Sequence, residues 1–214
     1  MRIIVFWDSI AEWLWDHEKW WWVQRLKTDF WKKYGYDNFV IWFWISAHTS
    51  SHLKNYIKTC FEAVSKRQAD KHKESIVIIS IGINDSAIWI VSWKNQVDYK
   101  KFKNNIIEIS NYLKSENLIK KVLFLWNTNV VESMINKTEV DSSHYFFNSE
   151  IQKYNNFIFS LSDKNGFDFL SLFWIMDDED LDTDWLHPNS SWHRKIYNQV
   201  KKYLELNVFP YVNK

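Results

Sequence analysis

The chain has a single cysteine, Cys60, and this excludes a disulfide framework and a cysteine-based zinc site. Its formal net charge is only +1, so it lacks the basic surface of a nucleic-acid-binding protein. No apolar run is long enough to span a membrane, and no signal-peptide pattern opens the chain. We therefore expect a cytoplasmic protein with no stable membrane insertion.

Glycine is also scarce, with 3 residues in a chain of 214. At the usual frequency of roughly 7%, a chain of this length carries about 15 glycines, which α/β folds use at turns and helix ends. Tryptophan is as abundant as glycine is rare, with 15 residues, so the two types together have an ordinary total. The composition indicates that many tryptophans occupy positions where related folds have glycine.

Short apolar runs alternate with helical patterns along the chain. The runs are rich in isoleucine, valine and phenylalanine, as expected for strands buried on both faces, and cover residues 2–7, 39–44, 75–81, 121–126 and 167–173. Amphipathic patterns predict helices at residues 22–34, 51–68, 99–117, 148–163 and 190–206. Five strand–helix units predict a three-layer α/β/α fold with a doubly wound, flavodoxin-like, five-stranded parallel sheet. With no linker or internal repeat, residues 1–214 form one predicted domain.

Polar residues follow the predicted strands where the strands end. Ser9 follows the first strand, residues 45–48 the second and residues 82–85 the third, while an Asp-x-x-His pair, Asp184 and His187, follows the fifth. In such sheets, ligands bind beyond the carboxyl ends of the strands. A serine, turns able to donate hydrogen bonds, and an Asp–His pair are the groups that acyl transfer requires.

Four sequence blocks, in order and through nearly the whole chain, resemble the SGNH hydrolases, also called GDSL esterases and lipases. The family blocks Gly-Asp-Ser-Ile and Gly-Ile-Ser-Gly-x-Thr correspond to residues 7–10 and 44–49, which read WDSI and WISAHT. The third block, Gly-x-Asn-Asp, is intact at residues 82–85. The last, Asp-Gly-Leu-His-Pro-Asn, corresponds to DWLHPN at residues 184–189. Each block alone is weak, but four in order are specific.

The resemblance implies a role for each matching residue. Ser9 corresponds to the nucleophile, His187 to the general base, and Asp184 to the group that orients the imidazole. Asn84 and the backbone N–H groups of Ser9 and Ala47 correspond to the oxyanion hole, although the family has glycine where this chain has Ala47. No metal or cofactor is implied.

Other residues near the predicted site have weaker assignments. His48 could line the pocket or lie on the surface, and Tyr145 and Phe146, in the long connection at residues 129–147, could contact substrate. Taken singly, Ser9 could be a helix cap and Asn84 part of a turn. Cys60 falls on an apolar helical pattern, and the acidic run from residue 177 to 184 is expected to be a solvated loop apart from Asp184.

Several tryptophans coincide with glycines of the family pattern, namely Trp7, Trp44, Trp185 and Trp192, and Trp20 and Trp21 stand where related sequences often have a glycine pair. Trp13, Trp93, Trp126 and Trp174 lie near strand ends or turns, whereas Trp22 and Trp31 resemble true tryptophans. Some bacterial lineages read UGA as glycine and others as tryptophan. The pattern favours a gene from a UGA-glycine organism, with an alternative genetic code, translated with a UGA-tryptophan table.

The predicted function is a serine-dependent ester hydrolase acting through an acyl-enzyme on Ser9. Lysophospholipids, short acyl esters, acyl thioesters and acetylated sugars are all candidate small-molecule substrates. If the tryptophans are real, a non-catalytic binding domain on the same scaffold is the alternative. A flavodoxin-like nucleotide or flavin binder is disfavoured because the first strand–helix turn has no glycine-rich or Ser/Thr-rich phosphate cradle.

Overall fold

The computed structural model describes residues 1–11, 18, 21–35, 38–66, 73–136, 143–173 and 175–209. Five parallel strands form its central sheet in the order β2-β1-β3-β5-β7. They are β1 (Arg2–Trp7), β2 (Phe39–Trp44), β3 (Ser75–Ile79), β5 (Ile119–Leu125) and β7 (Asp168–Leu170). This order confirms the predicted doubly wound, flavodoxin-like sheet.

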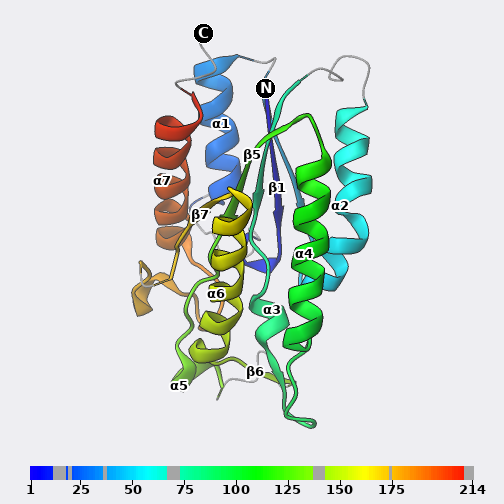
Figure 1. Ribbon diagram of the computed structural model, residues 1–214. Helices are drawn as coiled ribbons and strands as arrows, with labels where there is room; N and C mark the ends of the chain where they lie inside the picture. The colour runs from blue at the N-terminus through cyan, green and yellow to red at the C-terminus, as the bar shows by residue number, and fades with distance from the viewer. Residues whose placement is uncertain are drawn as a thin grey trace.

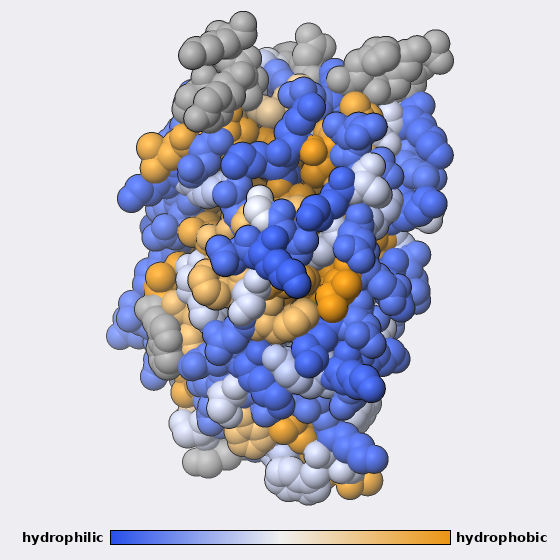
Figure 2. All heavy atoms as spheres, viewed as in Figure 1, coloured by the Kyte–Doolittle hydropathy of each residue, from blue (hydrophilic) through white to orange (hydrophobic). Residues whose placement is uncertain are grey.

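Helices cover both faces of this sheet, which confirms the three predicted layers (Figure 1). The helices α1 (Trp22–Tyr34) and α7 (Ser190–Asn207) pack on one face. The other face carries α2 (Ser50–Ser65), α4 (Tyr99–Ser115) and α6 (Asn148–Asn165). Figure 2 shows that hydrophilic residues dominate the outer surface over α4 and α6.

The two apolar cores follow directly from the alternation of side chains along the strands. In β1, Ile3 and Val5 face the α1/α7 layer, whereas Ile4 and Phe6 face the α2/α4/α6 layer. All four side chains are completely buried. The continuous apolar runs in the sequence therefore reflect a sheet covered on both faces.

The predicted boundaries lie within about three residues of those observed, and the differences occur at the ends of both strands and helices. The structure ends β3 at Ile79 and β7 at Leu170, so residues 80–81 and 171–173 lie beyond the strands that were predicted to include them. Short elements that the periodicity did not predict also lie at this edge. They are η1 (Ser9–Ala11), α3 (Ile83–Ser86), β4 (Ile88–Trp89), α5 (Glu132–Ile135), β6 (His144–Tyr145) and η3 (Asp178–Asp180).

Within the described residues, no helix has both the length and the apolar character needed to cross a membrane.

Candidate active site

Ser9 begins the short η1 helix directly after β1, at the carboxyl edge of the sheet. Its hydroxyl oxygen lies 3.0 Å from Nε2 of His187, a residue 178 positions later in the chain. Ser9 is 7% exposed, and the His187 side chain is 16% exposed. The sheet therefore brings the predicted nucleophile and base together at a partly open position.

The loop that carries His187 is held by its own hydrogen bonds. Asp184 Oδ1 accepts the backbone N–H groups of Leu186 at 3.0 Å and His187 at 2.8 Å. Asp184 Oδ2 lies 2.5 Å from His187 Nδ1. The backbone N–H of Asp182 donates to the His187 carbonyl at 2.9 Å and closes the loop. The Asp-x-x-His spacing thus lets one carboxylate fix both the turn and the imidazole.

The protonation state of Asp184 determines which nitrogen of His187 is basic. Burial alone would raise the pKa of Asp184, but the hydrogen bonds and charge of His187, together with the Leu186 N–H, hold that pKa below its usual value. The ionised carboxylate can only accept, so His187 Nδ1 must donate to it. Nε2 is then left with the lone pair that faces the Ser9 hydroxyl, as a general base requires.

The predicted oxyanion donors come from two further loops. Asn84, in α3, is buried, and its side-chain Nδ2 donates to the backbone carbonyl of His48 at 3.0 Å. The Asn84 amide therefore lies against the loop that contains Ala47. Ala47 has a φ of 57°, the left-handed region that glycine adopts most easily, and alanine occupies it at a cost of roughly 1–2 kcal/mol.

Gly82 is one place where glycine is needed and present. Its φ is 128°, and a Cβ at this position would meet the side-chain nitrogen of Asn127 at 3.0 Å. Asn127 Nδ2 also donates to the Ile81 carbonyl at 3.1 Å and to Asn155 Oδ1 at 2.9 Å. Close packing beneath the third motif thus fixes the backbone that leads into Asn84.

Asp8 is completely buried beside the nucleophile. Its Oδ1 accepts the Ile10 N–H at 3.1 Å, while Oδ2 has no hydrogen-bond partner among the described residues. Burial raises the pKa of Asp8 to about 7, Asp85 adds to this rise, and the Ile10 N–H and His187 oppose it. The local motif does not reveal this environment of Asp8, because Asp85 and His187 lie far from it in the sequence.

The predicted substrate-contact residues lie in different environments. His48 is half-buried, stacks on His52 with ring centroids 4.6 Å apart, and has a pKa lowered by burial and by His52. Tyr145 is half-buried in β6, which pairs with β4. Phe146 is buried in the apolar core beneath the α1/α7 layer.

A cleft of about 540 Å³ lies beside the Asp–His loop. Leu181, Asp182 and Trp185 line it from that loop, and Val131 and Met134 line it from the long connection at residues 129–147.

The acidic run at residues 177–184 is not a simple solvated loop, because Asp180 is buried and pairs with Lys195 at 2.6 Å. This pair ties the segment before Asp184 to α7.

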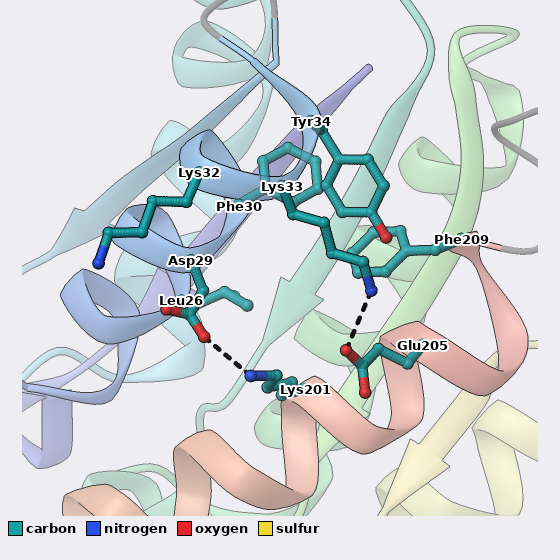
Figure 3. Close-up of a pocket in the computed structure, with 9 residues that line it drawn as sticks. All are labelled: Leu26, Asp29, Phe30, Lys32, Lys33, Tyr34, Lys201, Glu205 and Phe209. Carbon is teal, nitrogen blue, oxygen red and sulfur yellow. Dashed lines mark hydrogen bonds and ion pairs between the residues drawn. The ribbon is translucent and has the colours of Figure 1, made fainter.

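A second, smaller cavity of about 150 Å³ lies between α1 and α7 (Figure 3). Ion pairs between Lys201 and Asp29 and between Lys33 and Glu205 cross it, at 2.8 and 3.2 Å. None of the predicted site residues lines it.

Over the described ranges, no cluster of histidine, cysteine, aspartate or glutamate side chains has the arrangement of a metal site.

Comparison with known proteins gives a family match and similar folds. Residues 6–195 match the sequence profile of the GDSL-like lipase/acylhydrolase family. No curated protein sequence matches the chain.

Similar folds occur among solved structures, each at low sequence identity. An α/β hydrolase from the metagenome of Lake Arreo, Spain, has a TM-score of 0.67 and 15% identity over 94% of this chain and 93% of its own. The acetylxylan esterase Axe2 of Geobacillus stearothermophilus has a TM-score of 0.64 and 15% identity, over 94% of this chain and 92% of its own. A GDSL-like lipase from Bacteroides thetaiotaomicron has a TM-score of 0.64 and 19% identity, over 97% of this chain and 89% of its own.

Proposed function

The chain belongs to the GDSL-like lipase/acylhydrolase family, and from this we propose that it hydrolyses small carboxylic esters through an acyl-enzyme on Ser9. The observation that carries the proposal is the continuous chain of contacts from Ser9 Oγ through His187 to Asp184, with distances of 3.0 and 2.5 Å. Asn84, in α3, donates a hydrogen bond to His48 in the loop that contains Ala47, so the two predicted oxyanion donors lie on neighbouring segments.

In the proposed reaction, His187 Nε2 takes the Ser9 proton as Oγ bonds to the ester carbonyl carbon. The electron pair of the carbonyl moves to its oxygen, which accepts hydrogen bonds from the Ser9 and Ala47 N–H groups and the Asn84 amide. Collapse of this intermediate expels the alcohol, which receives the proton from His187. Water then repeats the sequence on the acyl-enzyme and releases the acid and Ser9.

The residues around Ser9, His187 and Asp184 decide which acyl and alcohol groups the site accepts. We propose that the cleft between the Asp–His loop and residues 131–134 receives one end of the ester. His48 and Tyr145, which do not line this cleft, are proposed as contacts for other parts of the substrate. Phe146 is buried in the apolar core and is not assigned a contact with substrate. Short acyl esters and acetylated sugars are the first substrates to test. A cytoplasmic location stays a prediction from composition.

A fluorophosphonate probe and p-nitrophenyl acetate test the proposal together. We expect the protein to be labelled at Ser9 and to turn over the ester, and the Ser9→Ala variant to lose both properties while keeping its circular dichroism spectrum. Ser92→Ala, which changes an exposed serine, is the matched control and should behave like the parent. Turnover retained by Ser9→Ala would remove Ser9 from the mechanism, and a folded but unlabelled parent would indicate a non-catalytic binding domain.

We further propose that several tryptophans are glycines in the native protein, encoded by UGA. Two backbone conformations support this, because Trp93 has a φ of 52° and Trp185 a φ of 60°. Bulky residues rarely adopt positive φ, whereas glycine does so freely. Trp93 also closes the turn at residues 89–94, where its N–H donates to the Trp89 carbonyl at 2.8 Å.

Burial adds a cost at three other positions, but it does not distinguish them from Trp22. The indole N–H groups of Trp7, Trp126 and Trp192 are buried with no hydrogen-bond partner among the described residues, an arrangement that costs roughly 1–3 kcal/mol for each group. The φ angles of these three residues are not positive, so the backbone alone does not require glycine there. Trp22, which resembles a true tryptophan, has a buried indole N–H of the same kind. Trp13, Trp20 and Trp174 lie outside the described residues.

The coding DNA tests this directly, since UGG codons at Trp7, Trp44 and Trp185 would end the idea. A physical test compares two single variants. Trp93→Gly should raise the free energy of unfolding by about 1 kcal/mol by removing left-handed strain. The control Trp31→Gly, inside helix α1, should lower it by about 1 kcal/mol. The chain with glycine at every position assigned to UGA should be more stable and more active as an esterase than the chain with tryptophan at those positions. Equal activity of the two chains would contradict the idea that the tryptophans disturb the packing.

A further inference from the structure

Three buried polar side chains form a hydrogen-bonded group at the start of α2. Asp85 Oδ1 and Oδ2 both accept the backbone N–H of Ser50, at 3.1 and 2.9 Å, and Oδ1 accepts the Ser50 hydroxyl at 2.5 Å. From α4, Asn105 Nδ2 donates to the hydroxyls of Ser50 at 2.9 Å and Ser51 at 3.0 Å. All three members of this Asp85–Ser50–Asn105 group are at most 1% exposed.

The group joins the two segments that carry the proposed oxyanion donors. Asp85 directly follows Asn84 in α3, and Ser50 lies three residues after Ala47. Across the same junction, Asn84 Nδ2 donates to the His48 carbonyl at 3.0 Å. The separation between the Asn84 amide and the Ala47 N–H therefore depends on how α3 is fastened to the start of α2.

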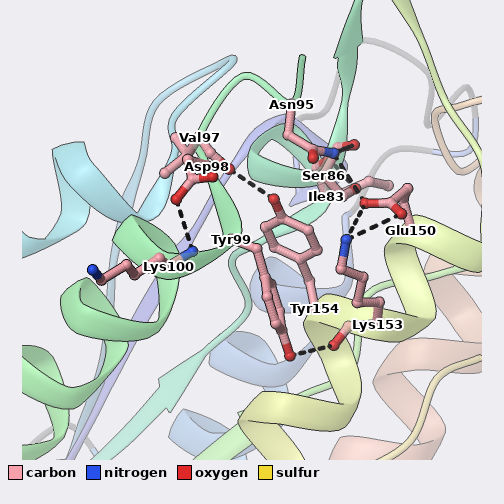
Figure 4. A network of polar contacts seen from close by, with 10 residues as sticks. All are labelled: Ile83, Ser86, Asn95, Val97, Asp98, Tyr99, Lys100, Glu150, Lys153 and Tyr154. Atoms are coloured by element: carbon pink, nitrogen blue, oxygen red, sulfur yellow. Dashed lines mark hydrogen bonds and ion pairs between the residues drawn. The ribbon is translucent and has the colours of Figure 1, made fainter. Parts of the chain in front are cut away.

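On its other side, α3 is held by a separate network (Figure 4). Asn95 Nδ2 donates to the Ser86 carbonyl at 2.9 Å, and the Tyr154 hydroxyl donates to the Val97 carbonyl at 2.7 Å. The Val97 N–H in turn donates to the Asp85 carbonyl at 3.2 Å. With α3 fixed in this way, the loop before α2 is the part that the Asp85–Ser50–Asn105 group must hold in place.

Besides the Asn84–His48 hydrogen bond, that loop is supported by the Thr49–His52 capping box and by the stacking of His48 on His52. Ser46 and Ala47 are exposed, and Ala47 adopts a left-handed conformation that alanine disfavours. A strained, exposed loop keeps its conformation only when its ends are fastened. The buried contacts of Ser50 with Asp85 and Asn105 provide this at the carboxyl end of the loop.

We propose that Asp85, Ser50 and Asn105 are positioning residues that hold the Ala47 N–H and the Asn84 amide at the spacing the oxyanion requires. The inference rests on the proposed esterase function. None of the three touches the substrate, so their effect on the reaction passes through the two donors. Losing the contacts should weaken binding of the transition state and leave binding of the ester ground state nearly unchanged.

The charge of Asp85 supports this role. Burial raises the pKa of Asp85 to about 6, while its hydrogen bonds from Ser50 and the charge of Lys101 oppose the rise. Asp8, from the nucleophile turn, and Tyr154, from α6, are the other titratable groups that interact with it. Above about pH 6 the ionised carboxylate accepts every Ser50 donor, and below that pH a proton competes for one oxygen.

A double-mutant cycle with p-nitrophenyl acetate tests the proposal in the full chain. Ser50→Ala should lower kcat by about 10- to 100-fold, with KM changed by less than about twofold, since a single lost oxyanion donor typically lowers kcat by about 10²–10³. In an Asn84→Ala background, where one donor is already missing, the same change should lower kcat by less than about threefold. Ser50→Thr keeps the hydroxyl and should restore most of the activity.

The matched control is Ser110→Ala, which removes another fully buried serine hydroxyl, on α4, that has no hydrogen-bond partner among the described residues. It should leave kcat unchanged. Equal losses from Ser50→Ala in both backgrounds, or a loss in KM alone, would overturn the positioning role. A parent that neither labels at Ser9 nor turns over ester overturns both this inference and the proposed function, whereas an active parent with an additive cycle overturns this inference only.

Discussion

Replacing Asp8 with asparagine should make the protein more stable, and the gain should grow with pH. Asp8 is completely buried, one of its oxygens has no hydrogen-bond partner among the described residues, and burial raises its pKa to about 7. Asparagine has a similar shape and still offers an oxygen to the Ile10 N–H, but it carries no charge at any pH.

The direction in which the free energy of unfolding changes with pH follows from the number of protons that each state binds. Between about pH 4 and pH 7, folded Asp8 holds a proton that the unfolded chain has lost, so the free energy of unfolding falls as pH rises through this window. The shift from 3.8 to about 7 is roughly 3 pKa units, or about 4 kcal/mol in full. About 2.5 kcal/mol of this should be lost between pH 5 and pH 8.

Urea unfolding followed by tryptophan fluorescence at pH 5, 6, 7 and 8 measures this effect. The difference between Asp8→Asn and the parent should widen by about 2.5 kcal/mol from pH 5 to pH 8. Asp98→Asn is the control, because Asp98 is an exposed helix cap and asparagine caps a helix equally well. A constant difference between Asp8→Asn and the parent across this range would refute the reasoning.

Three further changes test the site. Asp184→Asn should lower kcat for p-nitrophenyl acetate by about 10⁴, because its amide can donate to His187 Nδ1 and favour the wrong tautomer; a loss below tenfold would contradict this role. Asn84→Ala should lower kcat by about 10²–10³ with little change in KM, and a change in KM alone would remove Asn84 from the oxyanion hole. Ala47→Gly should relieve about 1 kcal/mol of backbone strain and raise the melting temperature by about 2–4 °C, measured by scanning calorimetry, while activity is retained. An unchanged or lower melting temperature would show that the loop stores no such strain.

Much of the fold was predictable because the inner strands β1 and β3 are buried on both faces and the edge strands are largely apolar. Continuous apolar runs such as residues 2–7 and 39–44 can only be satisfied in a covered sheet, and both predicted ranges match β1 and β2. Helix α1 was also predicted with its observed bounds. The short elements α3 and α5, of four residues each, were not predicted, since periodicity needs more than one turn to be visible.

The local part of the site was also predictable. Asp184 and His187 are three residues apart, so their pairing is a property of one loop and appears in the sequence. The contact between Ser9 and His187 spans 178 positions and was expected only because parallel strands end at one edge of the sheet. The resemblance to a known family supplied the roles of these residues.

The sequence by itself determined the layered fold, the order of the motifs and the Asp–His pair, because each depends on residues close together or on a repeated pattern. Only the tertiary structure decided the charge of Asp8, the Asp85–Ser50–Asn105 group and the left-handed backbone at Ala47, Trp93 and Trp185. Burial, hydrogen bonds between distant segments and backbone strain arise when separate elements pack together. No local stretch of sequence specifies such neighbours.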